Sequence, residues 1–126
     1  MTPRETIEAV YASFLTGDIP AILAKVAPNA SWRQPKTLPW GGDYVGPEGA
    51  GQFFAKLNEA METIRFEVQE NIAAGEEVFS FGVYTGKGRK TGKTATGEFA
   101  FRWRVKDGKI TSYVGYNDTA ALAAAL

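Results

Sequence analysis

The spacing of hydrophobic residues changes near residue 65, and this change constrains the fold of the chain more than any other feature. Across 7–15 the apolar side chains recur at intervals of three or four residues, the spacing of one face of a helix. Across 66–72 and again across 99–105 they alternate with other residues, as in strands that bury one face. Helices followed by a run of such strands predict an α+β domain, with the helices gathered on one face of an antiparallel sheet.

Capping signals place three helices before residue 63. The first has a capping box, a proline at its first position and a glycine at its end: Thr2 with Glu5, Pro3 and Gly17. The second is capped by Asp18, has Val26 on its buried face and closes at Pro28. The third runs from about Pro47 to Glu62.

The strands are predicted at 30–34, 65–72, 77–86, 94–106 and 109–117. Residues 35–46 hold two prolines and three glycines and are expected to form a loop. Asp107-Gly108 predicts a tight hairpin with positive φ angles, and Asp118 is expected to cap a short C-terminal helix. No repeat or linker interrupts the pattern, so residues 1–126 are expected to form one domain.

The chain of 126 residues contains no histidine and no cysteine, and its fourteen Lys and Arg balance fourteen Asp and Glu. The two absences exclude Ser-His-Asp and Cys-His catalysis, disulfides and thiolate metal sites. Zero net charge gives no electrostatic case for binding a nucleic acid or an anionic membrane. The charged N-terminal segment and the lack of a long apolar run predict a cytoplasmic protein without a membrane span, and no signal for a cofactor is present.

One segment superficially resembles a phosphate-binding loop, but its spacing is wrong. The motif needs a glycine five residues before Gly92, and Lys87 stands there instead. A strand follows the segment, so no helix N-terminus is available to hold a phosphate. A solvated basic turn is the better interpretation. Pairs of carboxylates such as Asp43 with Glu48 lack the spacing of a calcium loop, and no metal site is predicted.

Sixteen aromatic residues in 126 are more than a small core usually needs. They could fill the interior completely, or they could line an apolar pocket between the sheet and the helices. In the second case the expected ligand is a small, largely apolar molecule, and two amides would supply directional hydrogen bonds. The candidate ligand-binding residues are Trp32, Gln34, Trp40, Tyr44, Phe54, Phe79, Phe81, Phe99, Phe101, Tyr113 and Asn117.

A catalytic alternative needs a polarising group and a base. Gln34, Tyr11 or Tyr44 could bind a developing oxyanion. Glu70 shares its alternation class with apolar neighbours, so a buried Glu70 would have a raised pKa and could act as the base. The alternatives for Glu70 are a structural salt bridge or a different strand register.

The motifs together resemble the SnoaL-like branch of the nuclear transport factor 2-like superfamily, which includes ketosteroid isomerase. The segments that carry the resemblance are Tyr11-x-x-Phe14-x-x-Gly17-Asp18, Tyr44-x-Gly46-x-Glu48-Gly49, Phe99-Ala-x-x-Trp103-x-Val105-x-Asp107-Gly108 and Tyr116-x-Asp118-Thr119-Ala120. The resemblance implies a cone-shaped barrel, in which a curved, mostly antiparallel sheet wraps around N-terminal helices in a cystatin-like arrangement. It also implies a deep apolar pocket and a homodimer formed through the outer sheet face.

The catalytic residues of these relatives do not carry over. The resemblance places the isomerase base at Gln34 and its oxyanion tyrosine at Val10, while its protonated aspartate falls among 99–101. The histidine and acid of the cyclases fall on Phe101 and Gly115. The epoxide hydrolases need an Asp-Arg-Asp set in the pocket, whereas Arg102 and Arg104 are expected on the opposite face from Phe101.

Three functions therefore remain open. The first is a SnoaL-like protein that binds an apolar ligand without the known catalytic residues. The second is an isomerase, cyclase or hydrolase with a non-standard acid–base set. The third is an interaction module that dimerises through the face carrying Arg102 and Arg104 and holds no ligand.

Overall fold

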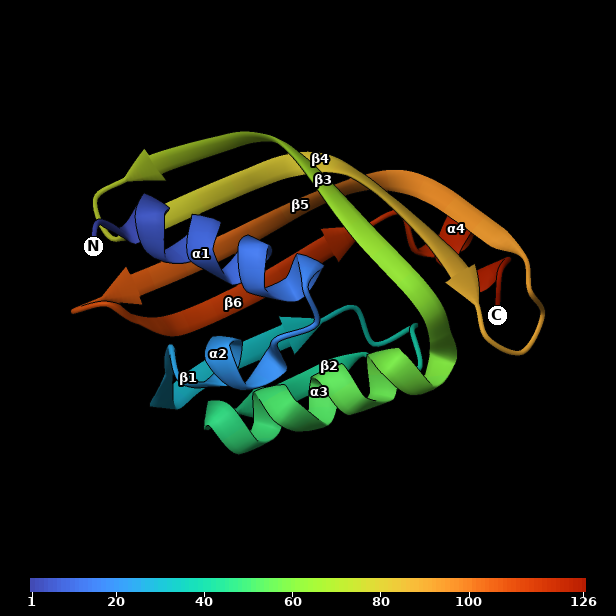
Figure 1. Ribbon diagram of the computed structural model, residues 1–126, viewed down its shortest axis with the longest axis horizontal. Helices are drawn as coiled ribbons and strands as arrows, with labels where there is room; N and C mark the ends of the chain where they lie inside the picture. The colour runs from blue at the N-terminus through green and yellow to red at the C-terminus, as the bar shows by residue number, and fades with distance from the viewer.

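Six strands form one curved sheet, and three helices pack across its inner face (Figure 1). The computed structural model describes all 126 residues. The strands are β1 (Val26–Gln34), β2 (Gly42–Val45), β3 (Met61–Ala74), β4 (Glu77–Gly88), β5 (Thr94–Lys106) and β6 (Lys109–Asn117). The helices are α1 (Pro3–Leu15), α2 (Ile19–Leu23), α3 (Gly46–Ala60) and α4 (Thr119–Ala123). None of them combines the length and the apolar composition that crossing a membrane requires.

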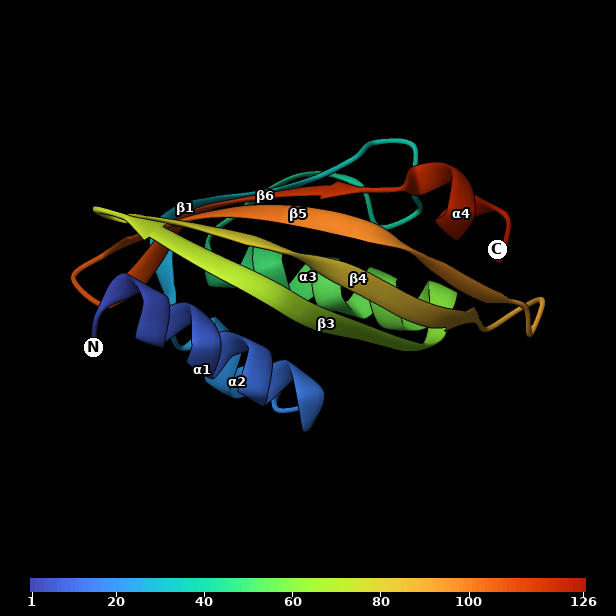
Figure 2. The same ribbon diagram turned by 90° about the horizontal axis from the view of Figure 1, so that it is seen from above.

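The strand order is β2-β1-β6-β5-β4-β3, and the α+β class is confirmed. Every neighbouring pair is antiparallel except β1 with β6, which is parallel. The edge strands β2 and β3 do not pair with each other, so the sheet is curved but unclosed rather than a complete barrel. Seen from above, α1 and α2 lie together on one side of the sheet, and the two termini lie at opposite ends of the molecule (Figure 2).

The capping signals of the sequence form as predicted. The Glu5 backbone N–H donates to Thr2 Oγ1 at 3.1 Å, and the Thr2 N–H donates to Glu5 Oε1 at 2.8 Å. Gly17 has a φ of 76°, which lets the chain turn into α2. Asp18 caps α2 and Asp118 caps α4, each accepting a backbone hydrogen bond at 3.2 Å. These polar contacts involve only near neighbours in the chain, which is why the sequence predicts them well.

The second helix is shorter than predicted, because it ends at Leu23 and Val26 already belongs to β1. Val26 pairs with Ile110 of β6, a contact between distant parts of the chain that helical spacing cannot reveal. Pro28 lies inside β1, although proline has no N–H to donate. The pairing with β6 is interrupted between Val26 and Ser31, so no hydrogen bond is lost there.

The predicted loop at 35–46 contains a strand. β2 pairs antiparallel with β1, and Tyr44 stands opposite Trp32. A strand of four residues is too short to show alternation, and its first residue, Gly42, has a φ of 124°. The third helix also ends two residues early, because Met61 and Glu62 begin β3.

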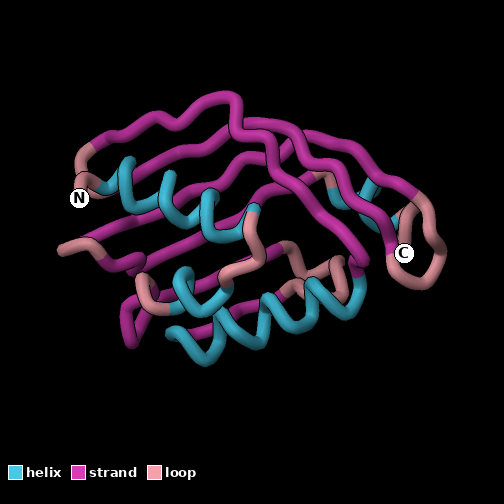
Figure 3. The backbone as a smooth tube through the Cα atoms, viewed as in Figure 1, coloured by secondary structure: helices cyan, strands magenta, loops and turns pink.

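A bulge in β3 decides between the interpretations of Glu70 in favour of a different strand register. The pairing with β4 shifts between Val68 and Glu70, and Figure 3 shows β3 bending midway along its length. The extra residue reverses the side-chain alternation, so Glu70 is exposed. Asn71 takes the inward position and accepts a 2.5 Å hydrogen bond from the hydroxyl of the fully buried Ser80. Glu70 is therefore not the buried carboxylate that the alternation suggested.

Phe79 and Phe81 lie on the outer face of the sheet, not on the inner face with Phe101. The register pairs Ser80 with Phe101, so the inward residues of β4 are the even-numbered ones. Phe81 is 40% exposed and pairs with Ala100 on the outer face. Apolar residues alternate along both β4 and β5, but this pattern does not say which of the two alternating sets of side chains faces the helices.

Tight packing between β4 and β5 gives a stability test. Tyr84 is fully buried, and its hydroxyl donates to the Asp118 carbonyl at 2.7 Å. A Cβ added at Gly97 would lie 2.6 Å from that hydroxyl oxygen. We expect Gly97→Ala to lower the free energy of unfolding by about 1–3 kcal/mol, measured by urea denaturation.

The matched control is Gly51→Ala in α3. Its added Cβ would meet only the end of the Leu23 side chain, at an ordinary 3.4 Å. Because alanine favours a helix over glycine, this variant is expected to gain up to about 1 kcal/mol. Equal effects of the two substitutions would contradict the packing described around Tyr84.

Candidate functional site

A cavity lies between the inner face of the sheet and the three N-terminal helices. Eighteen residues line it and sixteen of them are hydrophobic. Its wall on the sheet side comes mainly from β1, β5 and β6, where Trp32, Phe101 and Tyr113 are buried. The Trp32 and Tyr113 rings lie 4.5 Å apart between centroids. The helices supply the opposite wall, including Phe14 of α1 and Phe54 of α3.

The structure brings most of the predicted site residues together here. Those that line the cavity are Trp32, Gln34, Trp40, Phe54, Phe101, Tyr113 and Asn117. Tyr44 and Phe99 are buried outside the lining. The Tyr44 hydroxyl donates to the Trp40 carbonyl at 3.0 Å, and the Phe99 ring lies 4.4 Å from that of Phe101. Phe79 and Phe81 are on the far side of the sheet, as described above.

Sequence reasoning left several lining residues out. Trp103 lines the cavity, and its alternation with Phe101 was a sufficient signal to include it. Phe14 and Tyr11 were on the predicted apolar stripe of the first helix. Ile64 and Phe66 come from β3, and nothing in their local sequence indicates that β3 bends back over the helices.

The space inside this cavity is small. Its volume accessible to water is about 40 Å³, room for on the order of three water molecules. The aromatic side chains therefore fill most of the interior, and the deep pocket that the family resemblance implied is much narrower here. A groove of about 450 Å³ lies outside, between α1 and β3. Tyr11, Phe14, Ile64 and Phe66 line both spaces and form the partition between them.

A chain of polar side chains runs along β1 and β6 at the edge of the cavity. The Asn117 amide donates to Gln34 Oε1 at 3.0 Å, and the Gln34 amide donates to the Tyr113 hydroxyl. Gly115 lies between them on β6, and a Cβ there would be 2.8 Å from the Tyr113 oxygen. The position where the resemblance placed a catalytic acid is thus a glycine that makes room for the side chain of Gln34.

A second polar contact involves Tyr11. The indole N–H of Trp103 donates to the Tyr11 hydroxyl at 3.1 Å, with the two rings edge to face. Burial raises the pKa of Tyr11 to about 12, against the opposing effect of hydrogen bonds with Ser80 and Trp103. Tyr11 is therefore a neutral hydrogen-bonding group at physiological pH.

The cavity carries no charge near neutral pH. None of its lining residues is Asp, Glu, Lys or Arg, and its ionisable groups are Tyr11, Tyr84 and Tyr113. Burial raises the pKa of Tyr113 well above its usual value, and burial followed by the Asp118 carboxylate raises that of Tyr84 to about 12. The arrangement can hold apolar surface and form neutral hydrogen bonds. No three acidic side chains gather closely enough to hold a metal ion.

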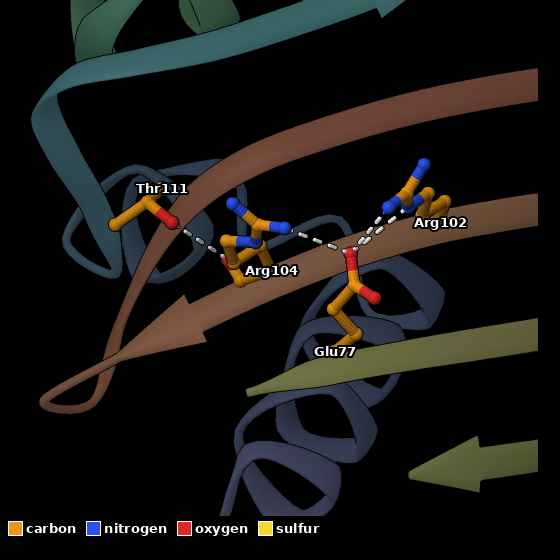
Figure 4. Close-up of polar contacts among 4 residues, drawn as sticks. All are labelled: Glu77, Arg102, Arg104 and Thr111. Atoms are coloured by element: carbon orange, nitrogen blue, oxygen red, sulfur yellow. Dashed lines mark hydrogen bonds and ion pairs between the residues drawn. The ribbon is translucent and has the colours of Figure 1, made fainter. Parts of the chain in front are cut away.

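Arg102 and Arg104 lie outside this site, as predicted. Both guanidinium groups meet one carboxylate oxygen of Glu77 on the outer sheet face, at 2.6 Å and 3.1 Å (Figure 4). The hydrogen bond from Arg102 is the main cause that lowers the pKa of Glu77. The Thr111 hydroxyl donates to the Arg104 carbonyl at 3.3 Å beside them. An Asp-Arg-Asp set inside the cavity is thus not formed by these arginines.

The buried phenols predict how stability depends on alkaline pH. Tyr11, Tyr84 and Tyr113 all have pKa values above the ordinary value near 10. Their contribution is complete below pH 10, because the unfolded chain releases these protons first. It is lost as pH rises through the raised pKa values, which are about 12 for Tyr11 and Tyr84. We expect urea denaturation to show lower stability at about pH 11 than at about pH 8, by up to about 1.4 kcal/mol per pH unit for each such phenol. Tyrosinate absorbance of the native protein that reaches its full amplitude near pH 10 would contradict the burial of these groups.

A model of the SnoaL-like domain family matches residues 7–113. A search of curated protein sequences gave no significant match. Among solved structures, an NTF2-like protein from Burkholderia thailandensis is 30% identical with a TM-score of 0.92, over 99% of this chain and 97% of that one. TerC, co-crystallised with polyporic acid, is 31% identical with a TM-score of 0.89, over 98% and 96% of the two chains.

A further NTF2-like protein of unknown function, from Burkholderia pseudomallei, is 25% identical with a TM-score of 0.91, over 98% of this chain and 95% of that one. The family model thus spans most of the chain, and the curved sheet with its N-terminal helices is common to the similar structures. This chain belongs to the SnoaL-like domain family and has the nuclear transport factor 2-like fold.

Proposed function

We propose that this protein binds one small, predominantly apolar molecule in the cavity between the helices and the sheet. The observation that carries the proposal is the lining, in which aromatic and aliphatic side chains dominate and no charged group is present. Such a surface favours apolar ligands with few polar substituents. The similarity to TerC, which was co-crystallised with polyporic acid, supports a ligand of aromatic character.

The size of the cavity determines how a ligand would enter. An aromatic molecule needs more than 40 Å³, so it must displace side chains of the protein. The partition facing the outer groove is the easiest to move, because Phe14 and Phe66 are only half-buried there. Their rings lie 5.6 Å apart between centroids and come from different elements, α1 and β3. We infer that the ligand enters from the groove and replaces ring–ring contacts of the partition with its own.

Filling the partition should block binding. Ile64 is half-buried and lines both the groove and the cavity. We expect Ile64→Trp to weaken the binding of 4-phenylphenol and of polyporic acid at least roughly tenfold, because the larger side chain occupies the space that the ligand needs. Isothermal titration calorimetry measures both affinities.

The matched control is Val45→Trp. Val45 is exposed on the edge strand β2, outside the cavity lining, so the same new side chain should leave both affinities unchanged. Unchanged binding in Ile64→Trp, with the variant shown to be folded by circular dichroism, would count against this entry route. Failure of the unmodified protein to bind either compound would overturn the proposed function.

No observation favours the catalytic alternative, an isomerase, cyclase or hydrolase with a non-standard acid–base set. Glu70, the candidate base, is exposed beyond the bulge of β3. Tyr11 and Gln34 line the cavity, whereas Tyr44 is outside the lining. Polarising groups are thus present without a carboxylate beside them, which supports binding over proton transfer.

We also propose that two copies associate through the outer face of the sheet. Phe81, Ala100 and Tyr116 stand side by side across β4, β5 and β6, and both aromatic residues are exposed. Large exposed apolar side chains on one surface typically mark an interface. The ion-paired Glu77 and Arg102 lie on the same face and provide a polar rim.

Light scattering after size exclusion tests the association. We expect a mass of twice the 13.7 kDa chain for the unmodified protein. Phe81→Asp is expected to produce the monomer, because a charge replaces apolar surface at the centre of the contact. Leu15→Asp, at an apolar residue on α1 that is even more exposed than Phe81, should leave the dimer intact. A monomer in the unmodified protein would refute this part of the proposal.

A further inference from the structure

Two buried polar atoms at the cavity have no hydrogen-bond partner. One is the indole nitrogen of Trp32, and the other is the amide oxygen of Asn117. Both residues line the cavity, and Trp32 is only 1% exposed. Buried polar atoms are nearly always paired in native proteins, since each unpaired one has lost its hydrogen bonds to water. Two such atoms in one cavity therefore call for an explanation.

Trp103 shows that an indole at this cavity can be fully satisfied. It is 3% exposed and lines the same space, yet its N–H donates to the Tyr11 hydroxyl at 3.1 Å. The fold thus provides a partner for one of the two indoles and none for Trp32. The unpaired polar atoms therefore lie on the side of the cavity formed by β1 and β6.

The hydrogen-bonded side chains of Asn117, Gln34 and Tyr113 add a further unpaired group on the same side. In the observed direction the Tyr113 hydroxyl accepts from Gln34 and has no acceptor for its own proton, while Asn117 Oδ1 has no donor. Turning both amides by 180° reverses the direction of the two hydrogen bonds but leaves the number of unpaired groups unchanged. One free donor and one free acceptor remain at the Asn117 and Tyr113 ends in either direction. Together with the Trp32 N–H, the wall offers two donors and one acceptor.

We propose that this wall recognises a hydroxyl group on an aromatic ligand, so that the class of ligand is a phenol. A hydroxyl oxygen can accept a hydrogen bond from the Trp32 N–H while its proton is donated to the free acceptor of the Asn117–Gln34–Tyr113 chain. A ring that carries this hydroxyl would lie against the aromatic remainder of the lining. This inference rests on the proposed function, since it specifies the ligand of the same cavity.

A pair of probes of matched size tests it. 4-Phenylphenol and 4-methylbiphenyl differ in one substituent, a hydroxyl against a methyl. A purely apolar cavity would favour the methyl compound, because burying an unpaired hydroxyl is costly. We expect the unmodified protein to bind 4-phenylphenol at least about tenfold more tightly, measured by titration calorimetry with competition for the weaker ligand.

Two matched substitutions then test which indole N–H causes the preference for 4-phenylphenol. Trp32→Phe should reduce it to roughly threefold or less, because the free N–H is removed. Trp103→Phe makes the same change at the paired indole, and the ratio of the two affinities should stay near that of the unmodified protein even if both affinities fall. Asn117→Leu removes the free acceptor Oδ1 and should also reduce the ratio, which keeps the test decisive if Trp32→Phe does not fold.

The outcomes separate the two proposals. Equal affinity for both probes, or tighter binding of 4-methylbiphenyl, would overturn the phenol assignment and leave the apolar binding site standing. Loss of the preference in Trp103→Phe, with Trp32→Phe unaffected, would overturn the role of Trp32. Binding of neither probe would overturn the proposed function and this inference together.

Discussion

The parallel pairing of β1 with β6 is the constraint on which the rest of the structure depends. It sets Trp32 beside Tyr113 and brings Gln34 to the Tyr113 hydroxyl, although the last two residues are 79 positions apart in the chain. Parallel neighbours need a long crossover, and here α3 and the four strands β2, β3, β4 and β5 lie between them in the chain. By placing β1 between β2 and β6, this pairing also gives α3 a surface to pack against.

Aromatic rings fill most of the space enclosed by that curved sheet. Rings from β1, β5, β6 and the helices pack edge to face or tilted against one another, and each such pair contributes about 0.5–1.5 kcal/mol beyond its buried area. The result is a nearly filled interior rather than an open cone. A dry aromatic environment also raises the cost of every unpaired polar atom, which makes the free N–H of Trp32 the most informative group at the cavity.

The predicted inward placement of side chains is confirmed where local pattern and register agree. Trp32, Phe101 and Tyr113 face the cavity because their strands have a neighbour on each side and bury one of their two alternating sets of side chains. The inward placement predicted for Phe81, and the possibility of a buried Glu70, failed for the same kind of reason. Phe81 lies on the opposite phase of β4, and a one-residue bulge reverses the phase of β3 before Glu70. The period of a strand is visible in its sequence, but the face that it buries depends on its partner.

The sequence by itself determined the α+β class, the capped helices, the Asp107-Gly108 hairpin and the absence of histidine chemistry. These properties depend on residue identity and on contacts between near neighbours. Only the tertiary structure decided that Val26 begins a strand, that the sheet stays open, and that Gln34 links Asn117 to Tyr113. These features require contacts between residues far apart in the chain, and such contacts form according to which surfaces bury one another rather than according to local spacing.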